Sequence, residues 1–342
     1  MQYELKTQVI SPLRQSFTHI TNRLGDKPAT RYQEGSIGFQ PKENFHYRPT
    51  WAPDKELYDP SYSAFTLTDP DDFTDPRQFY YTPYVTNRSD LHEGFGASLE
   101  YVTNRELFDK TPPEWLQVIG ETLIPLRHYE SGAQMIYSGA CRFSYGTALA
   151  QCLAFAGFDR IGNAQMISRI GIALGNQTAS ALKEAKRCWM EEEHLQPLRK
   201  ITEELMVTED WAVAVTGMDC VDRLINALQL THLDNLALTG GAGAYSLLIQ
   251  HQASWYKDHR RWLDALYKAW LEDETHAAHN AEQLRASLDR WSSPATEAVT
   301  AIAARIDHLL GADAGCVAAV EAAAQQSVAD LADLGLEEGA SA

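Results

Sequence analysis

The chain has 342 residues, of which 44% are hydrophobic and 22% charged, and its formal net charge is −17. This composition is typical of a globular protein with a large core. The acidity and the lack of any Lys/Arg-rich run exclude binding to nucleic acid and to an anionic membrane surface. No apolar run is long enough to span a bilayer, and the first residues lack the pattern of a signal peptide, so we expect a cytoplasmic protein.

The five cysteines are odd in number and widely spaced, and they form no CxxC pair or Cys/His cluster: Cys141, Cys152, Cys188, Cys220 and Cys316. A zinc site and a disulfide framework are therefore both disfavoured. We expect buried, inert thiols on helices.

The first 75 residues are rich in proline, which blocks helices and central strands: Pro12, Pro28, Pro41, Pro49, Pro53, Pro60 and Pro70. They also carry many aromatic residues, in which disordered segments are poor. We predict an extended arm, residues 1–75, that packs on a partner protein, with an arm that wraps only its own chain as the alternative. The candidate interface residues are Tyr47, Trp51, Phe79, Tyr80 and Tyr81.

From Asp75 onward the pattern is helical. Asp75-Pro76 is typical of a helix start and predicts a helix through about residue 108, with a disturbance at Pro83. The same start signal at residues 111–114 predicts a helix through 143. Residues 146–175 are apolar on nearly every face, which indicates a helix at the centre of a bundle.

Shorter amphipathic helices are predicted over residues 179–192 and 196–206, and Asp210 caps a helix over 211–230. Gly240-Gly241 ends that region before a long core helix over about 245–272, after which we expect peripheral helices. No strand signal is present. The prediction is an all-α helical domain over residues 76–310, followed by a peripheral Ala-rich tail over 311–342.

Two sequence pairs superficially match the Glu-x-x-His motif of ferritin-like di-iron proteins, in which two helices each supply that motif and two others each supply a Glu. They are Glu191 with His194 and Asp273 with His276. Both have polar flanks, whereas iron ligands must project into a dry core, so we interpret both as surface positions. GxSxG, P-loop and HExxH motifs are absent, and Gly240-Gly241-Ala242-Gly243 is interpreted as a helix break.

Several ordered blocks of sequence resemble one family. Residues 25–34 (GDKPATRYQE), 44–49 (NFHYRP), 75–81 (DPRQFYY), 159–162 (DRIG) and 168–171 (SRIG) closely resemble the β subunit of bacterial phenol hydroxylase oxygenase components. The similarity extends to about residue 275. It implies a ferritin-like helical fold, within a multicomponent di-iron monooxygenase.

The resemblance also implies partners and cofactors. In this family an (αβγ)₂ hydroxylase converts phenol to catechol with O₂, and the di-iron centre lies on the α subunit. A reductase with FAD and a 2Fe–2S cluster delivers electrons from NADH, and a small regulatory protein couples their delivery to turnover. The β subunit is taken to carry no metal, so we expect no catalytic, cofactor-binding or metal-binding residue in this chain.

The α-type motif, Asp-Glu-x-x-His followed by Gln two residues later, can be laid on residues 159–165. Its Glu then falls on Arg160 and its His on Asn163, so we interpret these as vacated metal-site positions. Residues 255–261 of the late helix contain no acidic residue with His three positions on. We hypothesise that Arg160 forms a buried ion pair, with Asp159 or with a carboxylate of a neighbouring helix, that substitutes structurally for iron.

Two alternatives remain open. One is a self-sufficient ferritin-like di-iron oxidase or oxygenase that uses the pairs ending at His194 and His276. The other is the β subunit of a related toluene, alkene or alkane monooxygenase.

Overall fold

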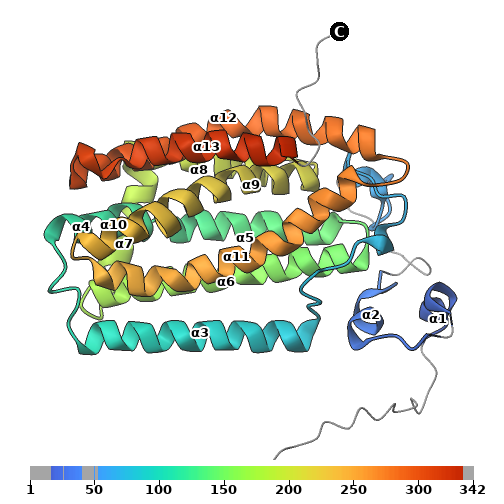
Figure 1. Ribbon diagram of the computed structural model, residues 1–342, viewed down its shortest axis with the longest axis horizontal. Coiled ribbons are helices and arrows are strands. Elements are labelled where there is room, and N and C mark those ends of the chain that lie inside the picture. Colours follow the sequence, from blue (N-terminus) through green and yellow to red (C-terminus); the bar gives the residue numbers. More distant parts are fainter. Residues whose placement is uncertain (1–16, 26, 41–49, 51–52, 334–342) are drawn as a thin grey trace, which may run out of the picture.

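A computed structural model describes residues 17–25, 27–40, 50 and 53–333 of the chain. All regular structure in these residues is helical, as the sequence predicts. Figure 1 shows the long helices running side by side, with α12 and α13 along one side of the bundle, α5, α6 and α11 through its middle, and α3 on the opposite side. None of the helices in the described part of the chain combines the length and apolar character that a membrane crossing requires.

Thirteen α-helices are found in the described residues: α1 Thr18–Leu24, α2 Arg31–Ser36, α3 Tyr81–Asn104, α4 Pro113–Val118, α5 Leu126–Phe143, α6 Thr147–Leu174, α7 Ser180–Glu191, α8 Gln196–Met206, α9 Trp211–Ile225, α10 Leu233–Thr239, α11 Gly243–Leu271, α12 Ala277–Leu310 and α13 Cys316–Asp333. Short 3-10 turns occupy Pro60–Tyr62, Pro70–Asp72, Glu193–Leu195 and Ala312–Ala314, and π turns occupy Ile119–Leu123 and Asn226–His232.

The apolar segment forms α6, and its central position is confirmed because it packs against α3, α5, α7 and α11. Side chains on most of its circumference are buried, as expected for a helix surrounded by others. One stripe is exposed, at Phe158, Ile161 and Gln165. The start of α9 is also as predicted, because the Asp210 side chain accepts hydrogen bonds from the backbone N–H groups of Ala212 and Val213.

The prediction that a helix starts at Asp75-Pro76 is wrong. The Asp75 carboxylate instead accepts hydrogen bonds from the backbone N–H and the guanidinium of Arg77, and Gln78 has a positive φ of 53°, so α3 begins only at Tyr81. Pro83 does not disturb the helix. It lies in the first turn, where its missing N–H would have no intrahelical partner.

Two predicted long helices are interrupted by π turns. The helix predicted over 114–143 consists of α4, the π turn Ile119–Leu123 and α5, and Pro125 immediately precedes α5. The helix predicted over 211–230 leaves α geometry after Ile225 and continues as the π turn Asn226–His232. Neither interruption has a distinct sequence signal apart from Pro125.

The helices after residue 272 are α12 and α13, which lie along one side of the bundle and contribute buried side chains to its core (Figure 1). α12 packs against α8, α9 and α11, and it buries Trp291 and Ile302. α13 packs on α12 and α9 through Cys316 and Val320, which are fully buried. Apolar positions spaced along these Ala-rich helices provide the buried face that composition alone obscures.

The described part of the arm packs on its own chain. The Phe65 ring lies 4.3 Å from that of Trp270, and the Tyr62 ring 4.9 Å from that of Phe143. The backbone N–H of Thr66 donates to the Asn280 side chain. Residues 53–75 therefore cover one end of α5, α11 and α12, and the packing of the arm on a partner stays a prediction.

Gly217 lies where α9 approaches α8 and α12 closely. A Cβ at this position would overlap Leu205 Cδ2 and come within 3.1 Å of the Trp291 ring. We expect Gly217→Ala to lower the free energy of unfolding by about 1–3 kcal/mol, because the core has no room for the methyl group. Urea unfolding measures this change.

Gly139→Ala is the matched control for that substitution. Gly139 also lies within a helix, but a Cβ there would meet nothing within 4 Å. Alanine should be neutral or stabilise the protein by about 0.5–1 kcal/mol, since it loses less conformational freedom on folding. Equal effects of the two substitutions would contradict the packing argument.

Candidate functional site

A buried arginine lies between the helices of the bundle. Arg160, on α6, is fully buried, and its guanidinium forms an ion pair with Asp222 on α9. Its Nη1 is 3.0 Å from Asp222 Oδ1 and 3.3 Å from Oε1 of Glu130 on α5. A single cation is thus held between carboxylates from two neighbouring helices, which is the pairing that a buried charge requires.

Aromatic side chains complete the surroundings of this guanidinium. Its carbon lies 4.8 Å from the centroid of the Trp255 ring and 5.3 Å from that of Tyr137, distances at which ring and cation attract. The Tyr129 hydroxyl donates to Asp222 Oδ1 at 2.6 Å. The arginine cluster (Glu130, Arg160, Asp222 and these three aromatic residues) is therefore rigid and almost completely desolvated.

Further polar residues face the same place from α6 and α11. Asn163 lies one turn after Arg160, and Gln252 and Trp255 lie three residues apart on α11; all three line one small cavity together with Glu130 and Asp222. Gln252 and Trp255 are therefore the positions of α11 that face Arg160 and Asn163 across this cavity. Within residues 255–261, His259 adjoins the arginine cluster without lining this cavity: its Nε2 is 3.2 Å from the Tyr137 hydroxyl and its ring centroid 5.1 Å from that of Trp255.

The arrangement has the layout of a ferritin-like metal site but different donors. Two helices contribute one carboxylate each, Glu130 and Asp222, while the other two contribute pairs three residues apart. These pairs are Arg160 with Asn163 and Gln252 with Trp255, where a di-iron centre needs Glu with His. Among the residues that the structure describes, no group of three or more His, Cys, Asp or Glu side chains could hold a metal ion.

Asp159 is not the partner of Arg160. It points to the other side of α6, where it accepts from Arg88 of α3 at 2.7 and 2.8 Å and from the Tyr84 hydroxyl at 2.8 Å. Arg88 also donates to Asp258 of α11 at 2.8 Å. Consecutive helical residues point about 100° apart, so Asp159 and Arg160 serve different interfaces. Asp159 therefore ties α3 to α6, and Arg88 ties α3 to α11.

The sequence analysis missed Glu130, Asp222 and Gln252. Glu130 and Asp222 lie on the buried faces of α5 and α9, and a carboxylate in such a position needs a buried partner. Nothing in the sequence pairs them with Arg160.

The predicted interface residues differ in how much of their side chains is exposed. Tyr47 and Trp51 lie outside the described residues. Phe79 is buried, with its ring 6.0 Å from that of Tyr84, and Tyr80 is half-buried. Tyr81 is 74% exposed. Of the described candidates, Tyr81 is the one that offers most of its surface to another protein.

The two Glu-x-x-His-like pairs lie at the surface, as interpreted from their flanks. Glu191 is exposed and pairs with Arg187, while His194 lies 3.1 Å from the Glu121 carbonyl oxygen. Asp273 accepts hydrogen bonds from Thr68 and from the backbone of Thr275. Neither pair faces the arginine cluster.

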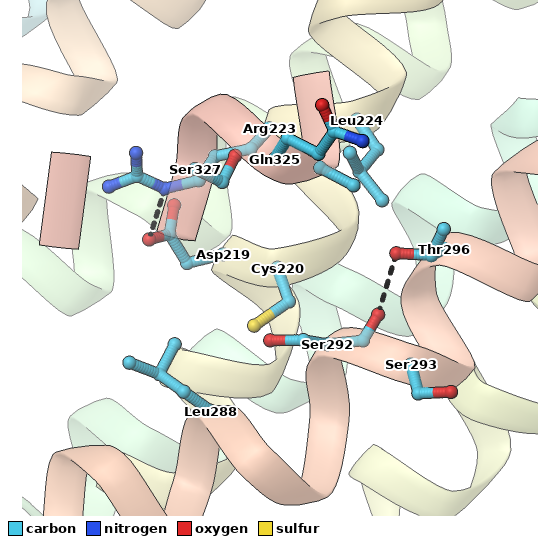
Figure 2. A pocket seen from close by; sticks show the side chains of 11 residues that line it. Asp219, Cys220, Arg223, Leu224, Leu288, Ser292, Ser293, Thr296, Gln325 and Ser327 are labelled. Atoms are coloured by element: carbon cyan, nitrogen blue, oxygen red, sulfur yellow. Dashed lines mark hydrogen bonds and ion pairs between the residues drawn. The ribbon is translucent and has the colours of Figure 1, made fainter. Parts of the chain in front are cut away.

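A second cavity, of about 270 Å³, lies between α9, α12 and α13. Figure 2 shows the Asp219–Arg223 ion pair at one end, Ser292 and Thr296 at the other, and the Cys220 thiol between them. Burial raises the pKa of this thiol to about 12. The cavity has no residue in common with the one beside Arg160.

Burial raises the pKa of Glu130 to about 7 from its usual 4.5, although Arg160 opposes the shift. The folded chain thus holds a proton that the unfolded chain releases, so stability falls as pH rises from about 4.5 to 7. Glutamine does not titrate, so we expect the unfolding free energy of Glu130→Gln to fall less between pH 5 and pH 8 than that of the unchanged protein. The difference should be roughly 2–3 kcal/mol, because one pKa unit corresponds to about 1.4 kcal/mol. Urea unfolding at pH 5 and pH 8 measures the difference.

The control is Glu203→Gln, which removes one charge from an exposed side chain on α8. Its unfolding free energy should follow that of the unchanged protein across the same pH range. If the Glu130 variant also runs parallel to the unchanged protein, the buried carboxyl does not retain its proton.

Known proteins share both the sequence and the fold. The family described as Methane/Phenol/Alkene Hydroxylase matches residues 51–274. The chain is 36% identical over 304 residues to the phenol 2-monooxygenase oxygenase component DmpL of Pseudomonas sp. (strain CF600), which covers 89% of this chain and 91% of the relative. It is 33% identical to component MhpL of Acinetobacter pittii (strain PHEA-2), covering 86% and 92%.

Two solved structures extend the likeness. A chain of phenol hydroxylase from Pseudomonas sp. OX1 superposes with a TM-score of 0.81 at 35% identity, covering 94% of this chain and 98% of that one. A chain of toluene 4-monooxygenase gives 0.75 at 19% identity, covering 88% and 99%, which is a likeness of fold alone. The ferritin-like helical fold is thereby confirmed. At this coverage and identity, the chain belongs to the methane/phenol/alkene hydroxylase family.

Proposed function

We propose that the chain is the non-catalytic β subunit of the oxygenase component of a phenol hydroxylase-type multicomponent monooxygenase. It assembles with a di-iron α subunit and a γ subunit in an (αβγ)₂ hydroxylase, which is served by a regulatory protein and a reductase with FAD and a 2Fe–2S cluster. The complex hydroxylates phenol to catechol. The similarity to two phenol 2-monooxygenase oxygenase components supports this substrate class over toluene, alkenes or alkanes.

One observation carries the proposal: the Arg160 guanidinium lies between carboxylates that α5 and α9 each supply. Arginine stays protonated, so it cannot donate a lone pair to iron. It also repels a metal cation placed beside the same carboxylates. Asn163 offers an amide and Trp255 an indole, neither of which replaces the imidazole that the di-iron pattern requires. Positions 160 and 163 are therefore vacated metal-site positions.

The ion pairs of Arg160 give the site a structural role instead. The positive charge of Arg160 balances the negative charge of Asp222, and this ion pair links α6 to α9. The ion pair of Arg160 with Glu130 links α6 to α5. In a di-iron chain, bridging carboxylates bind metal and connect these helices in the same way. We infer that the arginine cluster holds the bundle in the shape that the assembly needs.

Exposed apolar side chains favour a chain that works in an assembly. Tyr81 and Val85 on α3, and Phe158 and Ile161 on α6, are large and exposed. Tyr84 lies one turn after Tyr81 and directly before Val85, and its ring is 6.4 Å from that of Phe158, so the two stripes adjoin. Adjoining apolar surface of this kind is typical of protein interfaces.

The self-sufficient di-iron alternative lacks structural support. The carboxylates at Glu191 and Asp273 are exposed or engaged with surface backbone, and His194 and His276 do not meet in one dry pocket.

Metal analysis tests the proposal directly. We expect the purified chain, treated with Fe(II) and desalted, to retain far less than one iron, while the partner chain with two complete Glu-x-x-His motifs retains about two under the same treatment. Near two irons on this chain, lost on His194→Ala or His276→Ala, would establish the alternative.

Removing the guanidinium should expose its structural role. Arg160→Ala leaves Asp222 and Glu130 buried without their cation, and we expect a loss of about 3–5 kcal/mol in unfolding free energy and weaker assembly with the α subunit. Arg199→Ala, which breaks an exposed ion pair with Glu203, is the control and should change little. Unchanged stability and assembly of the Arg160 variant would refute the role.

A further inference from the structure

A small cavity lies beside the arginine cluster. It has a volume of about 30 Å³ and is lined by residues of α5, α6, α9 and α11 and of the two π turns. Those that matter for its chemistry are Glu130, Arg160, Asn163, Asp222, Gln252 and Trp255. All six are buried, so bulk water does not reach their polar atoms freely.

Three nitrogen donors among these residues make no hydrogen bond to the described protein. They are Arg160 Nε, Gln252 Nε2 and Trp255 Nε1. Arg160 uses its two terminal nitrogens for Asp222 and Glu130, so Nε is the part of the guanidinium that those carboxylates do not reach. Buried donors without a partner are rare in folded proteins, and a group of three around one cavity calls for an acceptor inside it.

We propose that this cavity is a hydration site that binds an ordered water molecule between α6 and α11. A water molecule needs about 10–15 Å³ and two to four polar partners, and the cavity meets both conditions. The water accepts hydrogen bonds from Trp255 Nε1 and from one of the other two unpaired donors, as its two lone pairs allow, and it donates to the carboxylates of Glu130 and Asp222.

Other occupants fit less well. The carboxylates of Glu130 and Asp222 repel a small anion, while the guanidinium repels a cation. An apolar guest would leave the Trp255, Gln252 and Arg160 donors unpaired. Water alone both accepts and donates without adding charge. The inference rests on the cavity and its donors, and it does not depend on the proposed function of the chain.

A crystal structure of the whole oxygenase complex, at a resolution where ordered water is visible, tests the site. We expect one round density feature within hydrogen-bond distance of at least two of the three donors. A matched crystal soaked in sodium bromide should show no anomalous peak there. An empty cavity, or a bromide peak in it, would overturn the proposal.

A spectroscopic measurement gives independent evidence. One indole band in the ultraviolet resonance Raman spectrum responds to hydrogen bonding of the indole N–H. The contribution of a single tryptophan to this band is the difference between the spectra of the complex and of its Trp→Phe variant. We expect Trp255→Phe to remove the signal of a hydrogen-bonded indole. Trp291→Phe is the control, since Trp291 Nε1 is also buried and unpaired but does not line this cavity. Two identical signals, both without a hydrogen bond, would contradict the proposal.

Discussion

The fold depends on how a positive charge is accommodated in the middle of a helical bundle. A fully buried guanidinium is tolerated only where opposite charge and hydrogen-bond acceptors meet it. Arg160 satisfies this condition through Asp222 and Glu130, which reach it from α9 and α5. The positions of these helices relative to α6 are therefore fixed by electrostatics as well as by apolar packing. The aromatic rings around the guanidinium exclude water and strengthen each interaction.

Similar charge pairing recurs farther out in the bundle. Asp159, adjacent to Arg160 in sequence, binds Arg88 and so attaches α3, which otherwise packs on the bundle only along one side. Asp219 of α9 binds Arg260 of α11 and Arg223 of its own helix, and accepts from the Tyr267 hydroxyl at 2.9 Å. The pairs Asp159–Arg88 and Asp219–Arg260 join helices that are distant in sequence. These pairs specify which helix faces meet, whereas apolar contacts alone would tolerate sliding.

The comparison with di-iron proteins shows how one arrangement of helices can serve two purposes. Six residues from four helices meet at the cavity beside Arg160, two as single carboxylates and four as pairs three residues apart. Their identities decide the outcome, because carboxylate with imidazole attracts iron and guanidinium with amide does not. A fold therefore does not imply an active site, and function must be argued from the donors present.

The sequence by itself determined the helical class, the extent of α6, the cap of α9 and the break before α11, because each depends on neighbours within a few residues. It also determined that positions 160 and 163 carry Arg and Asn rather than Glu and His, since that depends only on residue identity. It misplaced the start of α3 because the local ion pair of Asp75 with Arg77 competes with helix capping.

Only the tertiary structure decided the partners of Arg160. Asp222 and Glu130 are 62 and 30 residues away, and helical periodicity says which face a residue occupies but not which residue of another helix will meet it. The same holds for Gln252 and Trp255, whose register on α11 follows from how that helix packs across α6. The packing of side chains between helices, which no single segment encodes, sets these pairings.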